Sequence, residues 1–175
     1  QAITANSNPV KRVYFPREIL PISVVLANGI NFLIALVPLA VLMVVYGVAF
    51  TPALLWVGVI LAIQVALSIG LGLGLSAFNT LFRDVQQVID IFLLPLFFAT
   101  PIFYTLDLVQ QPLLRQAILL ANPMASLVSA YRAAIYGGQA PDLGLLAITA
   151  LEALGLLAIG WALFHRMSDA FTDEL

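Results

Sequence analysis

Two acidic residues, Asp90 and Glu152, lie inside apolar stretches of this 175-residue chain, where an ionisable side chain is costly and is a candidate for function. Asp90 lies near the start of its stretch, within reach of water or Arg83, and this position favours a structural role. Glu152 lies deeper and must be protonated, paired or exposed to an aqueous path. A proton relay needs several such groups in series, so the sequence favours a hydrogen-bonded, structural Glu152 over proton-coupled transport.

The sequence gives little support for other kinds of catalytic chemistry. The chain has no Cys and a single His, which excludes thiol chemistry and a Cys- or His-rich metal site. The dispersed acids and the lone His165 beside Arg166 do not form the paired carboxylates or His cluster expected of a membrane-embedded enzyme. A phosphate-binding loop with its Lys and Ser/Thr is also missing from the sequence. We therefore predict no catalytic residue, no metal and no cofactor.

The run from Gly70 to Ser76 alternates glycine or serine with leucine. It is no dinucleotide-binding loop, because no strand precedes it and no acidic ribose ligand follows it. Gly70 and Gly74 are four residues apart, as are Gly72 and Ser76, so each pair shares a helix face that another helix can approach closely. We predict close helix packing at these positions.

The composition places the chain in lipid. Hydrophobic residues make up 62% and charged residues 9%, against about 45–50% and about 25% in soluble domains. The 64 residues from Ile19 to Phe82 contain no Asp, Glu, Lys or Arg, whereas one membrane span needs about 20 apolar residues. The net charge of −2 and the scattered basic residues exclude a nucleic-acid partner. The sequence predicts a multi-pass protein in a lipid bilayer.

The predicted fold is an all-α integral membrane protein with one transmembrane domain over residues 1–175. Four spans are expected at residues 19–50, 53–78, 85–104 and 143–164. Between the last two, residues 105–142 contain two apolar segments of helical spacing, 109–120 and 124–136, separated by Asn122-Pro123. Each is too short to cross alone. They form either a re-entrant element or two amphipathic helices lying flat on the bilayer.

Basic residues near the span ends predict the orientation. Four crossings place the segment 1–18, the turn at Arg83 and the tail 165–175 on one side, with five basic residues near the span ends against two on the other. We therefore expect the cytoplasm on that side and residues 105–142 on the opposite side. The chain begins at Gln1 without Met, and we expect further residues upstream.

Five aromatic residues lie within 13 positions of the third predicted span: Phe92, Phe97, Phe98, Phe103 and Tyr104. Aromatic residues commonly form belts at the membrane interface. They also offer ring faces on which sugars can stack while passing through a conduit. The residues alone leave both interpretations open.

The segment Asn8–Pro21 joins basic, aromatic and proline residues immediately before the first span. Such a segment suits either lipid headgroups or the groove of a soluble partner. Its string Lys-Arg-Val-Tyr-Phe-Pro-Arg-Glu-Ile-Leu-Pro is followed in order by Phe82-Arg83-Asp84-Val85, Thr100-Pro101-Ile102-Phe103-Tyr104 and Asn122-Pro123. Together these four signals resemble the permease subunit of type-2 ABC exporters, in the branch that exports O-antigen, teichoic acid and capsular polysaccharides.

The resemblance implies a permease of the bacterial inner membrane with six spans per subunit, working as a homodimer with two ABC ATPase subunits to move a lipid-linked glycan. This chain then corresponds to the last four spans. Its two short helices correspond to re-entrant periplasmic helices, and Phe98 to Tyr104 to the outer mouth of the conduit. Arg83 and Asp84 correspond to a cytoplasmic turn. The residues implied to contact the ATPase are Lys11, Arg12, Tyr14, Phe15, Pro16, Arg17 and Glu18.

Two alternatives remain from the sequence. A drug or small-lipid exporter of the same superfamily would share these signals. A membrane-embedded enzyme acting on lipid-linked sugars is disfavoured by the dispersed acids described above.

Overall fold

The computed structural model describes residues 18–81 and 85–168, and every regular element in these ranges is helical. This confirms the predicted all-α fold. The elements in chain order are α3 (Ile19–Val45), the 3-10 turn η1 (Pro52–Leu54), α4 (Leu55–Leu81), α5 (Val85–Ala99), the 3-10 turn η2 (Leu106–Leu108), α6 (Pro112–Ala121), α7 (Pro123–Ile135) and α8 (Leu143–Ser168).

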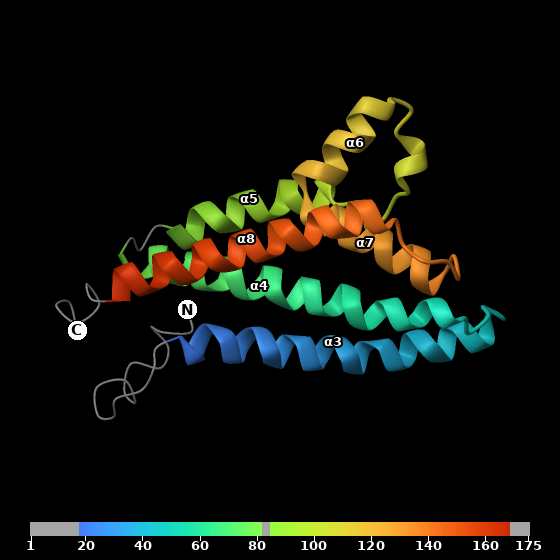
Figure 1. Ribbon diagram of the computed structural model, residues 1–175, viewed down its shortest axis with the longest axis horizontal. Coiled ribbons are helices and arrows are strands. Elements are labelled where there is room, and N and C mark those ends of the chain that lie inside the picture. Colours follow the sequence, from blue (N-terminus) through green and yellow to red (C-terminus); the bar gives the residue numbers. More distant parts are fainter. Residues whose placement is uncertain (1–17, 82–84, 169–175) are drawn as a thin grey trace.

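Three helices, α3, α4 and α8, are long and apolar enough to cross a membrane. They contain 27, 27 and 26 residues, or about 40 Å of helix each. All three run along the long axis of the molecule (Figure 1). Their outer faces expose large apolar side chains, such as Val37 on α3 and Leu151 on α8. Lipid tails solvate such faces, whereas water does not.

At the third predicted span, residues 85–104, the observed helix is shorter than the prediction. Helix α5 ends at Ala99, and its 15 residues cover about 22 Å, less than the hydrocarbon thickness of about 30 Å. The helix stops because Thr100 precedes Pro101, and a residue before proline is disfavoured in the α conformation. Residues 100–105 continue as non-helical chain up to η2.

The first predicted span, residues 19–50, also extends beyond its helix. Helix α3 passes through Pro38 and ends at Val45, because Gly47 adopts a positive φ of 69°. The N–H groups of Tyr46 and Val48 then donate to the carbonyls of Leu42 and Met43. This left-handed glycine directly after the last turn is a common helix terminus, and it starts the connection to η1 and α4.

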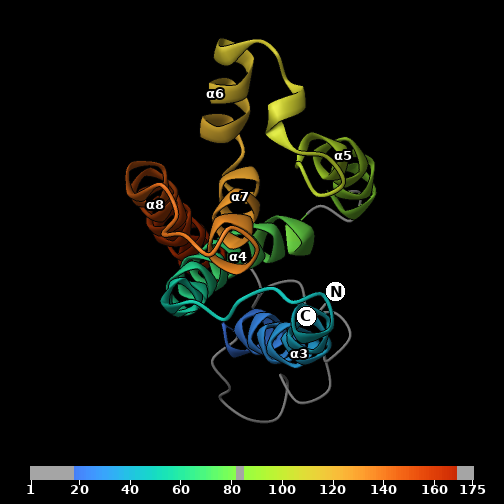
Figure 2. The same cartoon turned by 90° about the vertical axis from the view of Figure 1, so that its right-hand side faces the viewer.

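Helices α6 and α7 form a pair bent by 104°, which confirms two short helices in series. Asn122 ends α6 and caps α7 with an extended backbone, and its side chain accepts from the N–H groups of Met124 and Ala125. Pro123 follows at the first helical position, where its missing N–H is harmless. Figure 2 shows α6 pointing away from the bundle while α7 lies beside α4.

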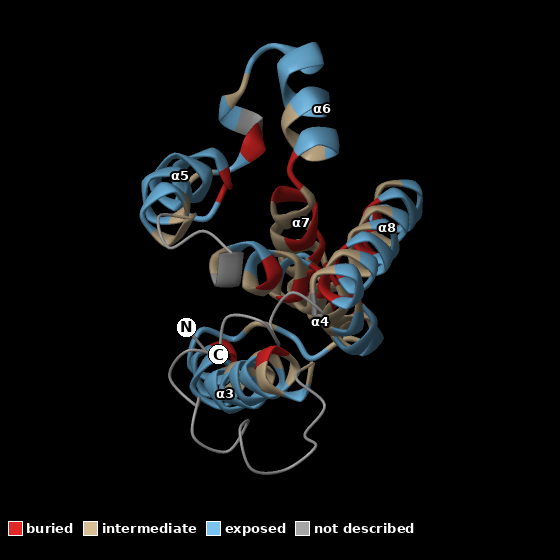
Figure 3. Ribbon diagram, turned by 90° about the vertical axis from the view of Figure 1, so that its left-hand side faces the viewer, coloured by how far each residue is buried: buried red, intermediate tan, exposed pale blue. Residues whose placement is uncertain are grey.

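The core is formed by α4, α7 and α8. Its buried residues come from all three helices: Ile60, Leu67, Leu127, Ala130, Ala134, Leu146 and Ala153. Figure 3 shows burial concentrated on α7 and on the facing sides of α4 and α8, whereas α3 and α5 are mostly exposed. Helix α5 has no buried residue. The central trio thus forms a packed unit, with α3 and α5 more loosely attached.

The glycine prediction is confirmed at the crossing of α4 and α8. A Cβ added at Gly70 would lie 2.5 Å from the backbone nitrogen of Leu157, and one added at Gly160 would overlap the carbonyl of Gly70. The opposite face of α4 contacts α3, because a Cβ at Gly72 would meet Val25 at an ordinary 3.5 Å. Small residues thus let the backbones of α4 and α8 touch, the usual basis of helix association in lipid.

Candidate functional site

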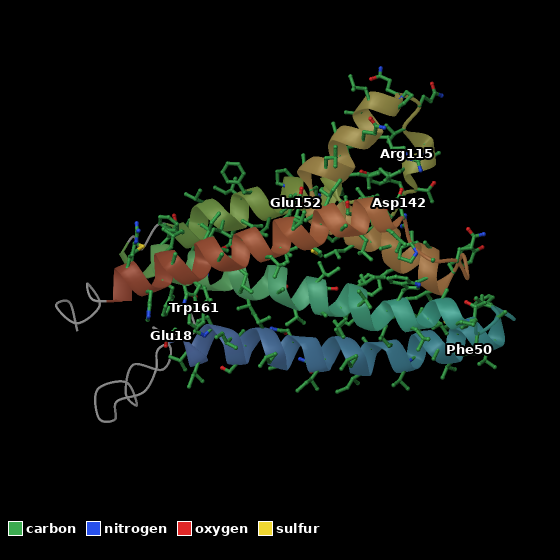
Figure 4. All side chains as sticks on the ribbon, viewed as in Figure 1. Glu18, Phe50, Arg115, Asp142, Glu152 and Trp161 are labelled. Atoms are coloured by element: carbon green, nitrogen blue, oxygen red, sulfur yellow. The ribbon has the colours of Figure 1, made fainter. Side chains whose placement is uncertain are left out.

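The start of α3 and the end of α8 meet at one end of the bundle (Figure 4). There His165 Nδ1 lies 3.6 Å from Glu18 Oε1, and the ring of Trp161 lies beside that of His165, with centroids 6.2 Å apart. Among the predicted ATPase-contacting residues, Glu18 is described. The others (Lys11, Arg12, Tyr14, Phe15, Pro16 and Arg17) lie outside the described residues, as do Arg83 and Asp84 of the predicted turn.

Most of the predicted conduit aromatics gather at the C-terminal end of α5 and in the residues just after it. Phe97 packs edge-on against Phe98 and against Phe103, with ring centroids 5.7 and 5.6 Å apart. The hydroxyl of Tyr104 donates to the carbonyl of Ala99 at 3.3 Å. The structure therefore brings four of the five together, while Phe92 lies earlier on α5 as an exposed side chain.

An open cavity of about 470 Å³ lies between α5 and the start of α7. Asp90 and Phe97, seven residues apart on one face of α5, both line it, and Met124 lines it from α7. The lining is almost entirely apolar apart from Asp90 and Thr100. One predicted membrane-depth acid therefore shares a cavity with one of the predicted conduit aromatics.

The other predicted acid, Glu152, lies on α8 away from this cavity. Contrary to the expected hydrogen-bonded Glu152, its Oε2 atom is buried and has no hydrogen-bond partner among the described residues. Metal binding has no support in the same ranges, since no group of three His, Cys, Asp or Glu side chains is close enough to hold an ion. The two acids do not form a pair that could share catalytic work.

A buried hydrogen bond joins the end of α5 to the bend between α6 and α7. The side-chain amide of Asn122 donates to the hydroxyl oxygen of Thr100 at 3.0 Å, and that hydroxyl donates to the carbonyl of Leu96 at 2.9 Å. Both residues are buried. Two of the sequence signals are therefore in direct contact in the structure, the string Thr100–Tyr104 and the pair Asn122-Pro123.

A second link joins the chain that follows α5 to the C-terminal end of α7. Arg132 lies in the last turn of α7, and its Nη1 and Nη2 atoms donate to the carbonyls of Tyr104 and Ile102, each at 2.7 Å. Sequence reasoning counted Arg132 only as a charge on the loop side. The available signal was an arginine within an apolar helical segment, a position where a charged group needs a partner.

Helix α7 is itself fixed to α4 by polar and aromatic contacts. The hydroxyl of Tyr131 donates to the side-chain oxygen of Gln64 on α4 at 2.9 Å. The ring of Tyr131 also lies 5.6 Å from that of Phe32 on α3. These contacts lie on the bundle side of α7, and Arg132 reaches the chain after α5.

Comparison with known proteins gives the family. Residues 9–136 match the model of the ABC-2 type transporter family. The chain is 33% identical to an O-antigen export system permease protein, RfbA, of Myxococcus xanthus over 99% of this chain and 67% of that protein. Two proteins of the same description from Klebsiella pneumoniae are 29% and 28% identical over 98% of this chain and 65% of their own length.

The chain thus spans about two thirds of the length of these relatives. The family match covers the N-terminal segment, α3, α4, α5 and the bent pair, and the relatives extend the similarity through α8. With its long apolar helices, the chain is a multi-pass protein of the bacterial inner membrane. By the family model and by its relatives alike, this protein belongs to the ABC-2 type transporter family.

Proposed function

We propose that this chain is the membrane-spanning permease subunit of an ATP-driven exporter that moves lipid-linked polysaccharide across the bacterial inner membrane. The observation that carries the proposal is the similarity to O-antigen export permeases over nearly the whole chain, at up to 33% identity. The three apolar helices of spanning length supply the membrane domain that such a function requires. In this role the chain performs no covalent chemistry.

The driving force comes from a separate ABC ATPase subunit, which contacts residues 11–18 of each permease copy in a homodimer. Glu18 and His165 lie 3.6 Å apart, so the end of this segment adjoins the end of α8. Helix α8 packs closely on α4 through Gly70 and Gly160. A push on the segment therefore reaches the central trio of helices directly, and a shift between packed arrangements opens or closes the path.

The aromatic residues at the end of α5 form the outer mouth of the path. Phe97, Phe98 and Phe103 present ring edges and faces in one cluster, and Phe97 also lines the cavity that α5 shares with α7. Aromatic faces combine an apolar surface with a specific geometry. Such faces suit a sugar chain that must move through the path without binding tightly.

Replacing Tyr14, Phe15 and Arg17 together with alanine is expected to abolish glycan export while the permease still inserts. The substitutions remove both aromatic groups and one of the three cationic groups available to the ATPase. Surface glycan of cells that rely on this exporter measures the loss, and undiminished export would contradict the coupling role.

The matched control for this variant replaces the same three residue types elsewhere in the chain, at Tyr46, Phe50 and Arg115. Phe50 and Arg115 lie far from Glu18 (Figure 4), and Tyr46 directly follows the last residue of α3. Because Phe50 and Arg115 lie far from Glu18 and Tyr46 follows the opposite end of α3, the control variant should retain export.

Replacing Glu152 with glutamine is expected to leave export within about twofold of the parent protein. Glutamine keeps the shape of the acid but cannot release a proton, and a proton relay needs several acids in series. The rate of glycan appearance at the cell surface, measured with and without a protonophore at constant ATP, tests this. Loss of export with a normal amount of protein in the membrane would instead place Glu152 in a proton pathway.

A further inference from the structure

The chain that follows α5 is held at two points by the two ends of α7. Asn122, at the start of α7, bonds to Thr100, and Arg132, in its last turn, bonds to the carbonyls of Ile102 and Tyr104. Residues 100–105 form neither helix nor strand, and a buried carbonyl needs a partner. The carbonyls of Thr100 and Thr105 accept from the nearby N–H groups of Ile102 and Leu108, whereas those of Ile102 and Tyr104 accept from Arg132. We call residues 100–106 the exit segment.

The geometry of the Arg132 contact suits a guanidinium group in particular. Its two terminal nitrogens each donate at 2.7 Å to carbonyls two residues apart in the exit segment. A planar fork with fixed donors matches two such acceptors at once, whereas the ammonium group of lysine acts as a single point charge. The contact therefore fixes both the position and the orientation of this stretch of backbone.

The backbone held in this way carries Phe103, one of the three rings of the aromatic mouth, whereas Phe97 and Phe98 lie on α5. Phe103 lies between the two residues whose carbonyls Arg132 binds, and it is 78% exposed although its ring contacts Phe97. The hydroxyl of Tyr104 reaches back to Ala99. Because Phe103 has little burial to hold it, the backbone must set where its ring lies.

Helix α7 connects the exit segment to the bundle. Leu127, Ala130 and Ala134 of α7 are buried in the core that α4 and α8 share, and Tyr131 bonds to Gln64 of α4. Helix α5, in contrast, has no buried residue. A displacement of the central trio relative to α5 is therefore transmitted to the exit segment through α7.

From this arrangement we infer that Arg132 is a positioning residue that ties the exit segment to α7, so that Phe103 moves with the α4–α7–α8 core relative to Phe97 and Phe98 on α5. The part of this inference that concerns transport rests on the proposed function. The positional part concerns the fold alone and is tested without transport.

Thiol labelling tests the position, because these 175 residues contain no natural cysteine, and any cysteine in the rest of the complete permease is first replaced by serine. Leu106 and Leu108 both lie on η2 but are 7% and 72% exposed, so L106C reports release of the exit segment and L108C reports access of the reagent. A134C, at a fully buried position of α7, reports whether α7 has left the core. Each cysteine is introduced into the complete permease in its native membrane, with Arg132, R132K or R132Q, and labelled with a membrane-impermeant maleimide.

In the R132Q background, the L106C thiol is expected to react at least about tenfold faster than with Arg132 present, because two charge-assisted hydrogen bonds are lost. The R132K background should give an intermediate rate. The L108C thiol should react equally in all backgrounds, and the A134C thiol should stay protected. R166Q, which removes an arginine from the last turn of α8, serves as the charge-matched control and should leave the L106C thiol protected.

Two labelling results would overturn the inference. One is an unchanged rate for the L106C thiol in the R132Q background. The other is simultaneous exposure of the A134C thiol, since Arg132 would then hold α7 in the core rather than the exit segment on α7.

Glycan export measured in the same variants separates the two proposals. We expect R132Q to export at about a tenth of the parent rate or less, and R132K to recover part of the loss. Export by R132Q at the parent rate, despite a released exit segment, would overturn the role of Arg132 in transport. A parent protein that exports no glycan would refute the proposed function while leaving the labelling result valid.

Discussion

Replacing Gly70 with alanine is expected to separate α4 from α8 and to lower the stability of the folded protein by about 3 kcal/mol, the upper part of the range for overpacked sites. The added methyl group would lie 2.5 Å from the nitrogen of Leu157 and 2.6 Å from the carbonyl carbon of Leu156. Ordinary contacts need about 3.5–4.0 Å, and these are backbone atoms that cannot rotate away. Thermal unfolding of the purified protein in detergent, followed by size-exclusion chromatography, measures the loss.

Other glycines of the same two helices provide the matched controls. Gly58 on α4 and Gly155 on α8 have nothing within 4 Å of an added Cβ, so G58A and G155A should be neutral or slightly stabilising because alanine favours helix. G160A should be as damaging as G70A, since its Cβ would overlap the carbonyl of Gly70. If G70A and G155A were equally stable, α4 and α8 would not cross at Gly70 and Gly160.

Replacing Asn122 with alanine is expected to lower the free energy of unfolding by about 2 kcal/mol, because its side chain both caps α7 and bonds to Thr100. Its oxygen caps α7 by accepting from the N–H groups of Met124 and Ala125, at 3.1 and 3.4 Å, and loss of such a cap costs about 1 kcal/mol. Its amide donates to buried Thr100, and loss of this bond costs about 1 kcal/mol more, because the Thr100 hydroxyl keeps its bond to the carbonyl of Leu96. Thermal unfolding in detergent again gives the difference.

Two further variants separate the contributions of Asn122. N122D keeps the capping oxygen but lacks the amide donor, so it should lose only the bond to Thr100. T100V removes the partner hydroxyl, and the double variant N122A/T100V should be about 1 kcal/mol more stable than the sum of the single changes predicts. Strict additivity would show that the Asn122–Thr100 contact does not contribute to stability.

The sequence predicted the elements whose signals are local. The apolar run from Ile19 to Phe82 indicated two long helices, which the structure has as α3 and α4. Asn122-Pro123 indicated the break between two short helices, because asparagine caps and proline starts a helix. The end of α5 at Ala99 was also encoded locally, by Thr100 before Pro101, but the hydropathy of the following residues led to a longer predicted span.

The contacts between distant residues could not be predicted in the same way. Spacing showed that Gly70 and Gly74 share a face, but only the crossing of α4 with α8 identifies Gly160 as the partner. Asp90 and Glu152 were both candidates because each lies in an apolar stretch. The structure places Asp90 in the cavity of α5 and α7, and Glu152 on α8 away from it.

By itself, then, the sequence determined that the chain is helical and embedded in lipid, and it contained the strings that mark its family. These properties follow from composition and from interactions within about one helical turn, which each segment carries wherever it lies. The tertiary structure alone decided that Arg132 binds the carbonyls of Ile102 and Tyr104 and that Asn122 binds Thr100. These partners are separated by 22 to 30 positions, and they meet only because the 104° bend and the packing of α7 against α4 and α8 bring α7 beside the end of α5.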